Sequence, residues 1–437
     1  MRVHRPTGRS IGGPAAAALA VLLVLAGTGA VAAREPVGGA TPAGADLPHP
    51  VGISAGRSFS CAIISDGTVW CTGENNGGQL GRGNTTDSAV PVQVKRRTSG
   101  LKPPVPLTKV TAVASGVEHN CAIREDTSVW CWGRNYFGSL GDGTTMRRTT
   151  AIQVRKMNGD PLLNVVAIGA GAISSCAVTS GGAGWCWGDT NAAGVGDGTG
   201  EARSRAVRVK KTGDTYLTGV AEMDGGAYHI CARTTDGAAW CMGSNSSGAI
   251  GDGTSQNRSR FTRVEKAGGG FLEDVVSISA GGGISCAVVV GGGAYCWGYG
   301  RGTGTGPSDN VTFIRRATAV RTSAQATLSG RVAVSAGYDF ACALGSDAGV
   351  RCWGRNDYGQ VANGTKTQAD YAVVAQKTGA TPLAGVISLS AGESHVCVTG
   401  TDLYNRCSGY NDLGALGDGT KITRTRAVPM IASWIFQ

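Results

Sequence analysis

Cysteine recurs along this chain at one fixed spacing. Cys121 and Cys131 lie ten positions apart, and all fourteen cysteines fall into seven pairs with that same separation. Successive pairs begin 55 to 60 positions apart. A fixed period of this size is the signature of a repeat architecture. The pairs are Cys61 with Cys71, Cys121 with Cys131, Cys176 with Cys186, Cys231 with Cys241, Cys286 with Cys296, Cys342 with Cys352, and Cys397 with Cys407.

Each pair brackets a predicted β-hairpin. In the first unit, Phe59–Ile63 and Val69–Cys71 are β-type runs on either side of Ser65-Asp66-Gly67. An Asp-Gly turn between two such runs is a strong hairpin signal, because glycine accepts a positive φ. A three-residue loop would place the two cysteines directly opposite each other, within reach of a disulfide. We therefore expect seven disulfides, one in each hairpin. Zinc is the alternative, but there is no C-x₂-C spacing and histidine is scarce.

Each unit supplies about four short strands and no persuasive helix. A strand such as Val51–Ala55 precedes the hairpin, and another such as Val90–Val94 follows a glycine-rich loop. Seven such units predict an all-β fold, a seven-bladed β-propeller of about 55-residue repeats. The first strand, Val51–Ala55, and the last, Ala427–Ile431, are expected to pair in one blade, so that the N- and C-terminal strands close the ring.

Glycine and aromatic residues keep the same register as cysteine. A glycine stands five positions before each first cysteine, and another stands two positions after each second one. This indicates either a positive φ or a close backbone approach.

Aromatic residues stand directly before and directly after the second cysteine of most pairs. The preceding set and the following set are expected to pack against the two neighbouring blades. An exposed stacking platform for sugars or bases is the alternative. The preceding set is Trp70, Trp130, Trp185, Trp240 and Tyr295; the following set is Trp132, Trp187, Trp297 and Trp353.

Signals for catalysis or cofactors are weak. Loops of sequence Gly-Asp-Gly-Thr, as at 141–144, carry one carboxylate each, which favours a local turn over a calcium or phosphate site. His119, His229 and His395 occupy a repeat position that accepts Phe and Ile elsewhere, so it is interpreted as a packing position. We predict no catalytic residue, no metal and no cofactor, and expect that the protein is not an enzyme.

The N-terminus has the pattern of a signal peptide. Arg2, Arg5 and Arg9 precede an apolar stretch, Ala15–Ala26, and small residues at 30–32 offer a cleavage site. We assign 1–33 to the signal peptide, 34–49 to a Gly/Ala/Pro linker and 50–437 to the propeller. An uncleaved membrane anchor is the alternative. Export agrees with paired cysteines, which persist in oxidising compartments, and predicts a secreted or cell-envelope protein without a later membrane span. The glycine-rich composition suggests a bacterial source.

Basic residues collect after the last strand of several units. Loops of equal register should lie on one face of the ring, where a rigid scaffold commonly binds. We interpret this face as a candidate surface for an anionic partner; a solvated rim that only keeps the protein soluble is the alternative. The residues are Lys95, Arg96, Arg97, Arg155, Lys156, Lys210, Lys211, Lys266 and Lys377.

The repeat consists of Gly-x-x-His-x-Cys-Ala, then Asp-Gly-x-x-Trp-Cys-x-Gly, then Asn-x-x-Gly-x-x-Gly-x-Gly. Gly226–Gly253 shows nearly all of it, and Gly116–Gly143 shows it with Thr127 at the turn glycine. This pattern resembles the regulator-of-chromosome-condensation (RCC1) repeat and spans about residues 51–431. The resemblance implies a seven-bladed propeller. Departures occur at Gly300–Gly306, and at Arg406 and Ser408 in the last unit.

The resemblance implies a fold more than an activity. The founding member is a nuclear nucleotide-exchange factor for a small GTPase, and secreted bacterial β-lactamase-inhibitor propellers share the fold and bind with one face. No inhibitory residue of theirs matches a position here. We expect a secreted, monomeric, non-enzymatic binding scaffold whose partner is another protein or an anionic cell-envelope polymer, not nucleic acid. The alternatives are a polysaccharide-active enzyme with its site at the central channel, and GTPase regulation.

Overall fold

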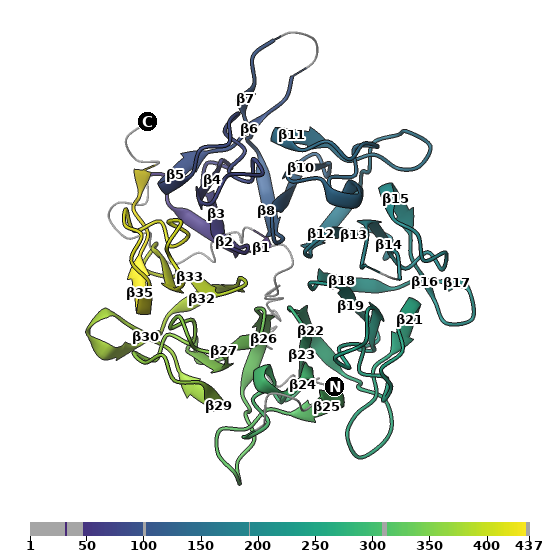
Figure 1. Ribbon diagram of the computed structural model, residues 1–437, viewed down its shortest axis with the longest axis vertical. Coiled ribbons are helices and arrows are strands. Elements are labelled where there is room, and N and C mark those ends of the chain that lie inside the picture. The colour runs from purple at the N-terminus through teal and green to yellow at the C-terminus, as the bar shows by residue number, and fades with distance from the viewer. Residues whose placement is uncertain (1–30, 33–46, 99–101, 192, 308–312, 434–437) are drawn as a thin grey trace, which may run out of the picture.

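Seven antiparallel sheets surround a common axis in the computed structural model (Figure 1). The structure describes residues 31–32, 47–98, 102–191, 193–307 and 313–433. Nearly all of the predicted signal peptide and linker lies outside the described residues. The all-β, seven-bladed propeller is confirmed.

Each blade is built from four consecutive strands, ordered from the axis outward. The blades are β2 (Pro50–Ala55), β3 (Phe59–Ile64), β4 (Val69–Gly73) and β5 (Ser88–Gln93); β8 (Val110–Ser115), β9 (His119–Arg124), β10 (Val129–Gly133) and β11 (Arg148–Gln153); β12 (Val165–Ala170), β13 (Ser174–Thr179), β14 (Gly184–Gly188) and β15 (Arg203–Arg208); β18 (Val220–Gly225), β19 (His229–Thr234), β20 (Ala239–Gly243) and β21 (Arg258–Arg263); β22 (Val275–Ala280), β23 (Ile284–Val289), β24 (Ala294–Tyr299) and β25 (Phe313–Ala319); β26 (Arg331–Ala336), β27 (Phe340–Gly345), β28 (Val350–Gly354) and β29 (Ala369–Val374); and β32 (Val386–Ala391), β33 (His395–Gly400), β34 (Asn405–Gly409) and β35 (Arg424–Pro429).

Shorter elements complete the chain. The strand β1 (Val31–Ala32) pairs antiparallel with β8. Two-residue strands form hairpins in three of the linkers between blades, and three 3₁₀ turns lie in loops. These are β6 (Lys95–Arg96), β7 (Val105–Pro106), β16 (Lys210–Lys211), β17 (Thr215–Tyr216), β30 (Gln376–Lys377), β31 (Thr381–Pro382), η1 (Tyr136–Gly138), η2 (Gly300–Gly302) and η3 (Thr378–Ala380).

The seven predicted disulfides are confirmed. In every blade the two cysteines are direct partners in the register of the second and third strands, and their Cα atoms lie 4.0–4.1 Å apart. Each bridge closes a short loop, which in the chain-entropy model contributes about 3 kcal/mol by restricting the unfolded chain. The bridges join Cys61 to Cys71, Cys121 to Cys131, Cys176 to Cys186, Cys231 to Cys241, Cys286 to Cys296, Cys342 to Cys352, and Cys397 to Cys407.

The prediction that the two aromatic sets pack against opposite neighbours is wrong. Trp130 and Trp132 both belong to the cluster between blade 2 and blade 1, together with Leu80 of blade 1. Residues two positions apart on a strand point to the same side of the sheet, and Cys131 between them points the other way. Aromatic residues of each blade therefore face the preceding blade, while its disulfide faces the following one.

Four blades bury the tryptophan that follows the second cysteine against the preceding blade: Trp132, Trp187, Trp297 and Trp353. Trp132 is fully buried, and its indole N–H donates to the carbonyl oxygen of Gln79 in blade 1 at 2.9 Å. Trp187 and Trp297 make the same bond to the preceding blade, at 2.8 Å to the carbonyls of Ser139 and Ala249. A buried indole with a satisfied N–H contributes a large apolar area without the cost of an unpaired donor.

The predicted pairing of the first and last strands is also wrong. β2 pairs with β3 of its own repeat, and β35 pairs with β34, because each unit supplies all four strands of one blade. Blade 7 instead packs side by side on blade 1, as every other pair of blades does. Ala55 donates its N–H to Ser390 Oγ at 2.9 Å, and Thr72 Oγ1 donates to the Gly414 carbonyl at 3.0 Å.

The glycines before each first cysteine form a ring around the axis. A Cβ on Gly116 would stand less than 3.0 Å from the carbonyl oxygen of Gly171, and the same clash with the next blade arises at all seven positions. None of the seven has a positive φ. Close backbone approach therefore explains this set, whereas the glycines after each second cysteine combine close approach with φ values of 93° to 116°.

The linkers between blades lie on the outer circumference. Each passes beside the outermost strand of the next blade: Arg96 of β6 pairs with Ala151 of β11, Lys211 of β16 with Phe261 of β21, and Lys377 of β30 with Ala427 of β35. They project from the rim in Figure 1. The exposed edge of most blades is thereby partly covered by the preceding linker.

Candidate functional site

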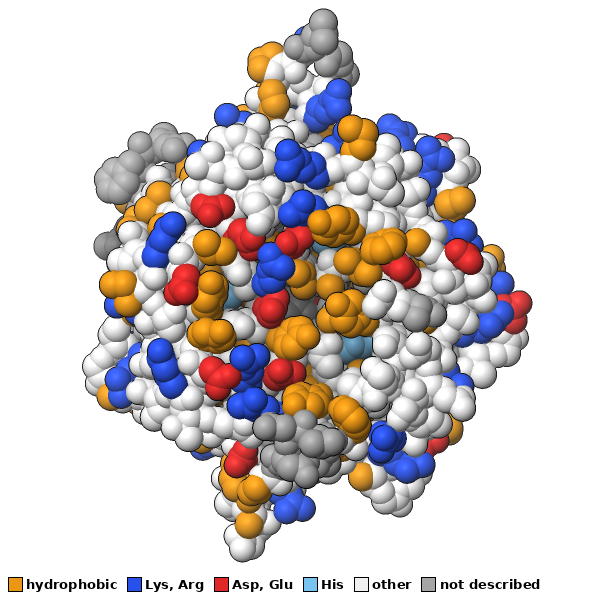
Figure 2. Space-filling view, in the orientation of Figure 1, with side chains coloured by type: hydrophobic (Ala, Val, Ile, Leu, Met, Phe, Trp, Pro, Cys, Tyr) orange, Lys and Arg blue, Asp and Glu red, His pale blue; other side chains and the backbone are white. Residues whose placement is uncertain are grey.

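One end of the ring carries side chains that vary between otherwise repeated positions. We call it the turn face: the turns joining the first to the second strand of each blade, and the loops that leave the third strand. The first set begins at the axial glycines, as in Gly56-Arg57-Ser58, and the second follows the later glycines, as in Gly73-Glu74-Asn75. The axial glycines and cysteines are constant in all seven blades, while the positions of Arg57, Ser58 and Glu74 vary. Figure 2 shows this end of the molecule.

A network of ion pairs joins blades 1 and 2 on the turn face. Arg57 Nη2 lies 2.7 Å from Glu118 Oε1 and 3.2 Å from Glu74 Oε2, and Arg134 Nε lies 3.2 Å from Glu118 Oε2. Partial burial opposes the charge on Arg57, but Glu74 and Glu118 outweigh it and raise its pKa. Arg134 also lies over the ring of Tyr136, 5.2 Å from its centroid.

A second network lies across the axis on blades 5 and 6. Arg355 Nε lies 2.6 Å from Asp357 Oδ2, and Arg355 Nη1 lies 3.9 Å from Asp339 Oδ2. Arg301 of blade 5 reaches Asp357 at 3.7 Å. Burial raises the pKa of Asp339 against the attraction of Arg355. Asp339 is the less compensated of the two carboxylates, since its contact with Arg355 is the longer one.

Glu393 of blade 7 lies between the two networks. Burial raises its pKa, while Arg57 and Arg355 oppose that shift from either side. Acidic and basic side chains therefore mingle around the mouth of the axis over blades 1, 2, 6 and 7, as Figure 2 shows. Blades 3 and 4 carry mostly uncharged turns there, such as Ala172-Ile173 and Ala227-Tyr228.

Exposed aromatic rings accompany the charges. Tyr136 and Phe137 are about half exposed, and Tyr228 and Tyr338 are exposed to a similar degree. Aromatic rings with a free polar tip and arginines are the residues that most often dominate protein interfaces. The turn face therefore combines the residue types of a protein-binding surface on a rigid base.

The central channel does not have the form of a catalytic pocket. It is lined by alanine and the axial glycines, with Arg57, Tyr338 and Glu393 at its mouth, and encloses about 50 Å³. Small-molecule sites usually measure about 300–1,000 Å³. Among the described residues, no three His, Cys, Asp or Glu side chains are grouped as metal ligands. The alternative of an enzymatic site at the channel gains no support from this geometry.

The nine predicted basic residues do not form a single patch. They lie on linkers at five blade junctions around the rim, as the strand and bridge pairs of Arg96, Lys156, Lys211, Lys266 and Lys377 show. Several already have partners: Arg96 lies over Trp130, Lys211 over Trp240, and Lys210 Nζ contacts Asp214 Oδ1 at 3.1 Å. Their role in binding an anionic partner stays a prediction.

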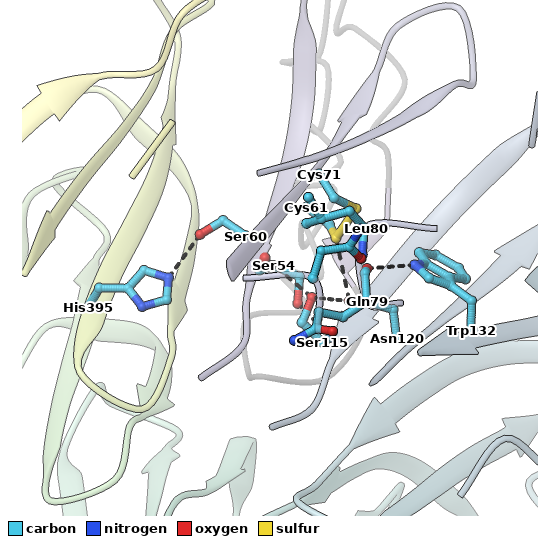
Figure 3. The surroundings of a disulfide bond; sticks show 11 residues. Ser54, Ser60, Cys61, Cys71, Gln79, Leu80, Ser115, Asn120, Trp132 and His395 are labelled. Atoms are coloured by element: carbon cyan, nitrogen blue, oxygen red, sulfur yellow. Dashed lines mark hydrogen bonds between the residues drawn. A yellow bond between two sulfur atoms is a disulfide. The ribbon is translucent and has the colours of Figure 1, made fainter. Parts of the chain in front are cut away.

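The three repeated histidines lie at the seams between blades. His119, His229 and His395 are buried, and each Nε2 shares a 2.8 Å hydrogen bond with a serine of the next blade, Ser175, Ser285 or Ser60. Figure 3 shows His395 directed at Ser60 across the last seam. Burial lowers the pKa of each histidine to about 4. A neutral, buried imidazole with one fixed partner acts as a packing residue here.

The Gly-Asp-Gly-Thr loops are locked by internal bonds. Asp142 Oδ1 accepts hydrogen bonds from the backbone N–H and hydroxyl of Thr144, and its Oδ2 accepts from Arg148 at 2.6 Å. Burial opposes ionisation, but the Thr144 and Arg148 bonds prevail and lower the pKa of Asp142. In blade 6 the equivalent pair is Asn363 and Ala369. The aspartate thus closes a turn, as predicted.

Sequence reasoning missed the turn-face residues. Arg57, Glu74, Glu118, Arg355 and Glu393 share no motif. The signal in the sequence was that these positions vary from repeat to repeat, while the glycines and cysteines beside them are the same in all seven.

No helix among the described residues is long and apolar enough to cross a membrane.

The fold and this surface define a disulfide-stapled β-propeller with a variable face built on a repeated frame. Models of the regulator of chromosome condensation (RCC1) repeat match residues 66–123 and, in a shorter form, 51–79, 110–139, 220–249 and 332–360. The chain therefore carries RCC1 repeats at these residues.

Known relatives agree with that assignment. The chain is 27% identical over 321 residues to the human E3 ubiquitin-protein ligase HERC2, covering 72% of this chain and 6% of HERC2. It is 27% identical over 261 residues to the ultraviolet-B receptor UVR8 of Arabidopsis thaliana, covering 59% of this chain and 55% of UVR8. The chain therefore spans less than two thirds of either relative.

Solved structures share the fold. Human WBSCR16 superposes with a TM-score of 0.66 at 19% identity, covering 84% of this chain and 94% of that one. Yeast RCC1 (Prp20), solved bound to Kap60, superposes with a TM-score of 0.64 at 16% identity, covering 99% and 92%.

Proposed function

We propose that this protein is a secreted, non-enzymatic scaffold that binds another protein through its turn face. The observation that carries the proposal is the contrast between seven repeated frames and the varied turns mounted on them. A frame held by seven disulfides and buried tryptophans keeps the turns in place, so little ordering entropy opposes association. Arginines, tyrosines and partly compensated carboxylates supply the contacts.

The relatives support protein binding as a class. Prp20 of Saccharomyces cerevisiae was crystallised with Kap60, and a second structure was described with its binding to Gsp1p and histones. GTPase regulation by analogy with RCC1 is the alternative for a chain retained inside the cell with reduced cysteines. The seven disulfides favour an extracellular location.

Site-specific photo-crosslinking tests the face. A photoreactive phenylalanine analogue replaces Tyr136 or Tyr338 on the turn face, and Tyr404, a similarly exposed tyrosine at a turn between second and third strands, serves as the matched control. Partner crosslinks from Tyr136 and Tyr338 but not from Tyr404 are expected in producing cells. Crosslinks from Tyr404 alone would refute the assignment of the face.

Charge reversal provides the second arm. The double variant Arg57→Glu with Arg355→Glu should weaken the crosslinked partner's binding at least about tenfold, because each change places a carboxylate beside existing carboxylates. Unchanged affinity would contradict the proposal.

The intact mass of the protein from culture supernatant, with and without reduction, tests export. Loss of the N-terminal segment and a gain of two hydrogens per disulfide on reduction are expected.

A further inference from the structure

A pocket opens on the outer edge of blade 3, away from the turn face. We call it the blade 3 rim pocket. Its volume is about 560 Å³, within the range of about 300–1,000 Å³ common for ligand sites. Its lining comes from three places: Trp185 of β14 and Arg208 of β15 from the blade itself, Lys156 and Met157 from the linker before it, and Lys210 and Tyr216 from the linker after it.

Blades 2 and 4 provide the comparison for this position. Their outer tryptophans are covered: Arg96 lies over Trp130 at 5.7 Å, and Lys211 and Arg263 lie over Trp240 at 5.7 and 5.1 Å. In blade 3 the residues equivalent to Lys211 and Arg263 are Lys156 and Arg208, by the same strand pairings.

These two cations leave the ring of Trp185 open. Arg208 is turned onto Tyr216, 4.2 Å from that ring's centroid, and no cation of the described residues lies over Trp185. The indole N–H of Trp130 is bonded to Ser128, whereas blade 3 has Ala183 at that place and blade 4 has Ala238. Trp185 therefore offers the pocket a ring face with no described cation over it and an N–H donor that has no partner among the described residues.

The charge of the pocket is one-sided. Lys156, Arg208 and Lys210 contribute three cations, and Asp197 is the single carboxylate in the lining. Asp197 already accepts from Arg203 at 2.7 Å and from Thr199, so it neutralises none of the three. Lys156 has no ion pair among the described residues, and Lys210 contacts Asp214, a carboxylate outside the pocket.

We propose that the blade 3 rim pocket binds an acidic saccharide chain, with a sugar ring against Trp185 and its carboxylate toward Lys156 and Arg208. The C–H face of a pyranose packs on an indole, and its hydroxyls accept from the free N–H and the lysines. The guanidinium of Arg208 matches a carboxylate in two-bonded geometry. Single-stranded nucleic acid would instead need successive stacking rings along a groove, and one face of Tyr216 is already covered by Arg208.

Calorimetric titration of the oxidised, full-length protein with galacturonic acid hexamer tests the site. Maltohexaose is the neutral probe and a dodecathymidine strand the nucleic-acid probe. The acidic hexamer should bind, and both other probes should bind at least about tenfold more weakly. The double variant Lys156→Gln with Arg208→Gln should weaken binding about tenfold or more, since each change removes a charge-assisted bond.

The control variants remove the same number of charges, or change the same kind of ring, at positions outside the pocket. The double variant Lys95→Gln with Arg97→Gln removes two exposed cations from another linker, and Trp130→Phe changes a covered ring; each should alter the affinity less than about twofold. Trp185→Phe, with an unchanged melting temperature, should weaken it about tenfold.

Three results would overturn the proposal: no binding of the acidic hexamer, equal loss in the control that changes Lys95 and Arg97, or tighter binding of dodecathymidine that depends on Trp185. The outcome is independent of the protein-binding proposal, because the changes at Arg57 and Arg355 leave this pocket untouched and that variant should bind the hexamer normally.

Discussion

Acid should weaken this protein through its three seam histidines. His119, His229 and His395 have folded-state pKa values of about 4 because burial disfavours the charged ring. An unfolded histidine titrates near 6.5. Between these values the unfolded chain binds more protons, so stability is fully present above about pH 6.5 and is lost progressively down to about pH 4. Linkage gives a loss of about 2 kcal/mol per histidine between pH 7 and pH 5.

One buried carboxyl group, that of Glu222, should instead stabilise the protein as the pH falls. Burial raises the pKa of Glu222 to about 7, against the attraction of Arg233 at 2.8 Å. The folded state then binds more protons between about pH 4.5 and 7, so acidification over that range adds about 2 kcal/mol. The three histidines outweigh Glu222, and these four groups together lower the free energy of unfolding by about 4 kcal/mol from pH 7 to pH 5.

The assay is guanidinium unfolding of wild type and of His119→Phe at pH 7 and pH 5. Phenylalanine fits because Phe59 and Phe340 occupy this position in blades 1 and 6. The variant should lose about 2 kcal/mol less than wild type on acidification. Ile284→Val, at the same position in blade 5, is the control: it should cost about 1 kcal/mol at both pH values. An equal acid loss in His119→Phe and wild type would refute the reasoning.

Three further perturbations follow from the same contacts. Gly116→Ala should destabilise by about 1–3 kcal/mol, since its Cβ meets the next blade's backbone, whereas Gly181→Ala, with open space around it, should melt within a degree or two of wild type. Asp252→Asn should cost about 1–3 kcal/mol of stability, because it leaves Arg258 unpaired. Adding Arg258→Ala should recover part of this loss, since blade 6 has Asn363 and Ala369 at the same two positions. Urea unfolding measures both variants. Loss of one disulfide should cost about 3 kcal/mol of stability, so reduction of all seven with dithiothreitol should lower the melting temperature far more than loss of one. An unchanged melting curve after reduction would contradict the stabilising role of the disulfides.

The repeat made the frame predictable. The spacing of Cys61 and Cys71 implied their opposition across a hairpin, because the pleat alternates with period two and the turn length sets the register. The same alternation, applied to Trp130 and Trp132, places both on one side of the sheet, and the contrary expectation erred at that step. Closure by shared strands also failed, because nothing in the repeat states which four strands make one blade.

The sequence by itself determined the strands, the hairpins, the disulfides and the number of blades, because all of these depend on residues near one another in the chain. The turn face was decided by tertiary structure. Arg57 and Glu118 lie 61 positions apart, and Arg57 and Glu393 are separated by most of the chain, yet ring closure brings them around one axis. The blade 3 rim pocket depends likewise on two linkers meeting over one tryptophan. Local pattern specifies a blade, but only the assembled ring specifies which side chains from different blades share a surface.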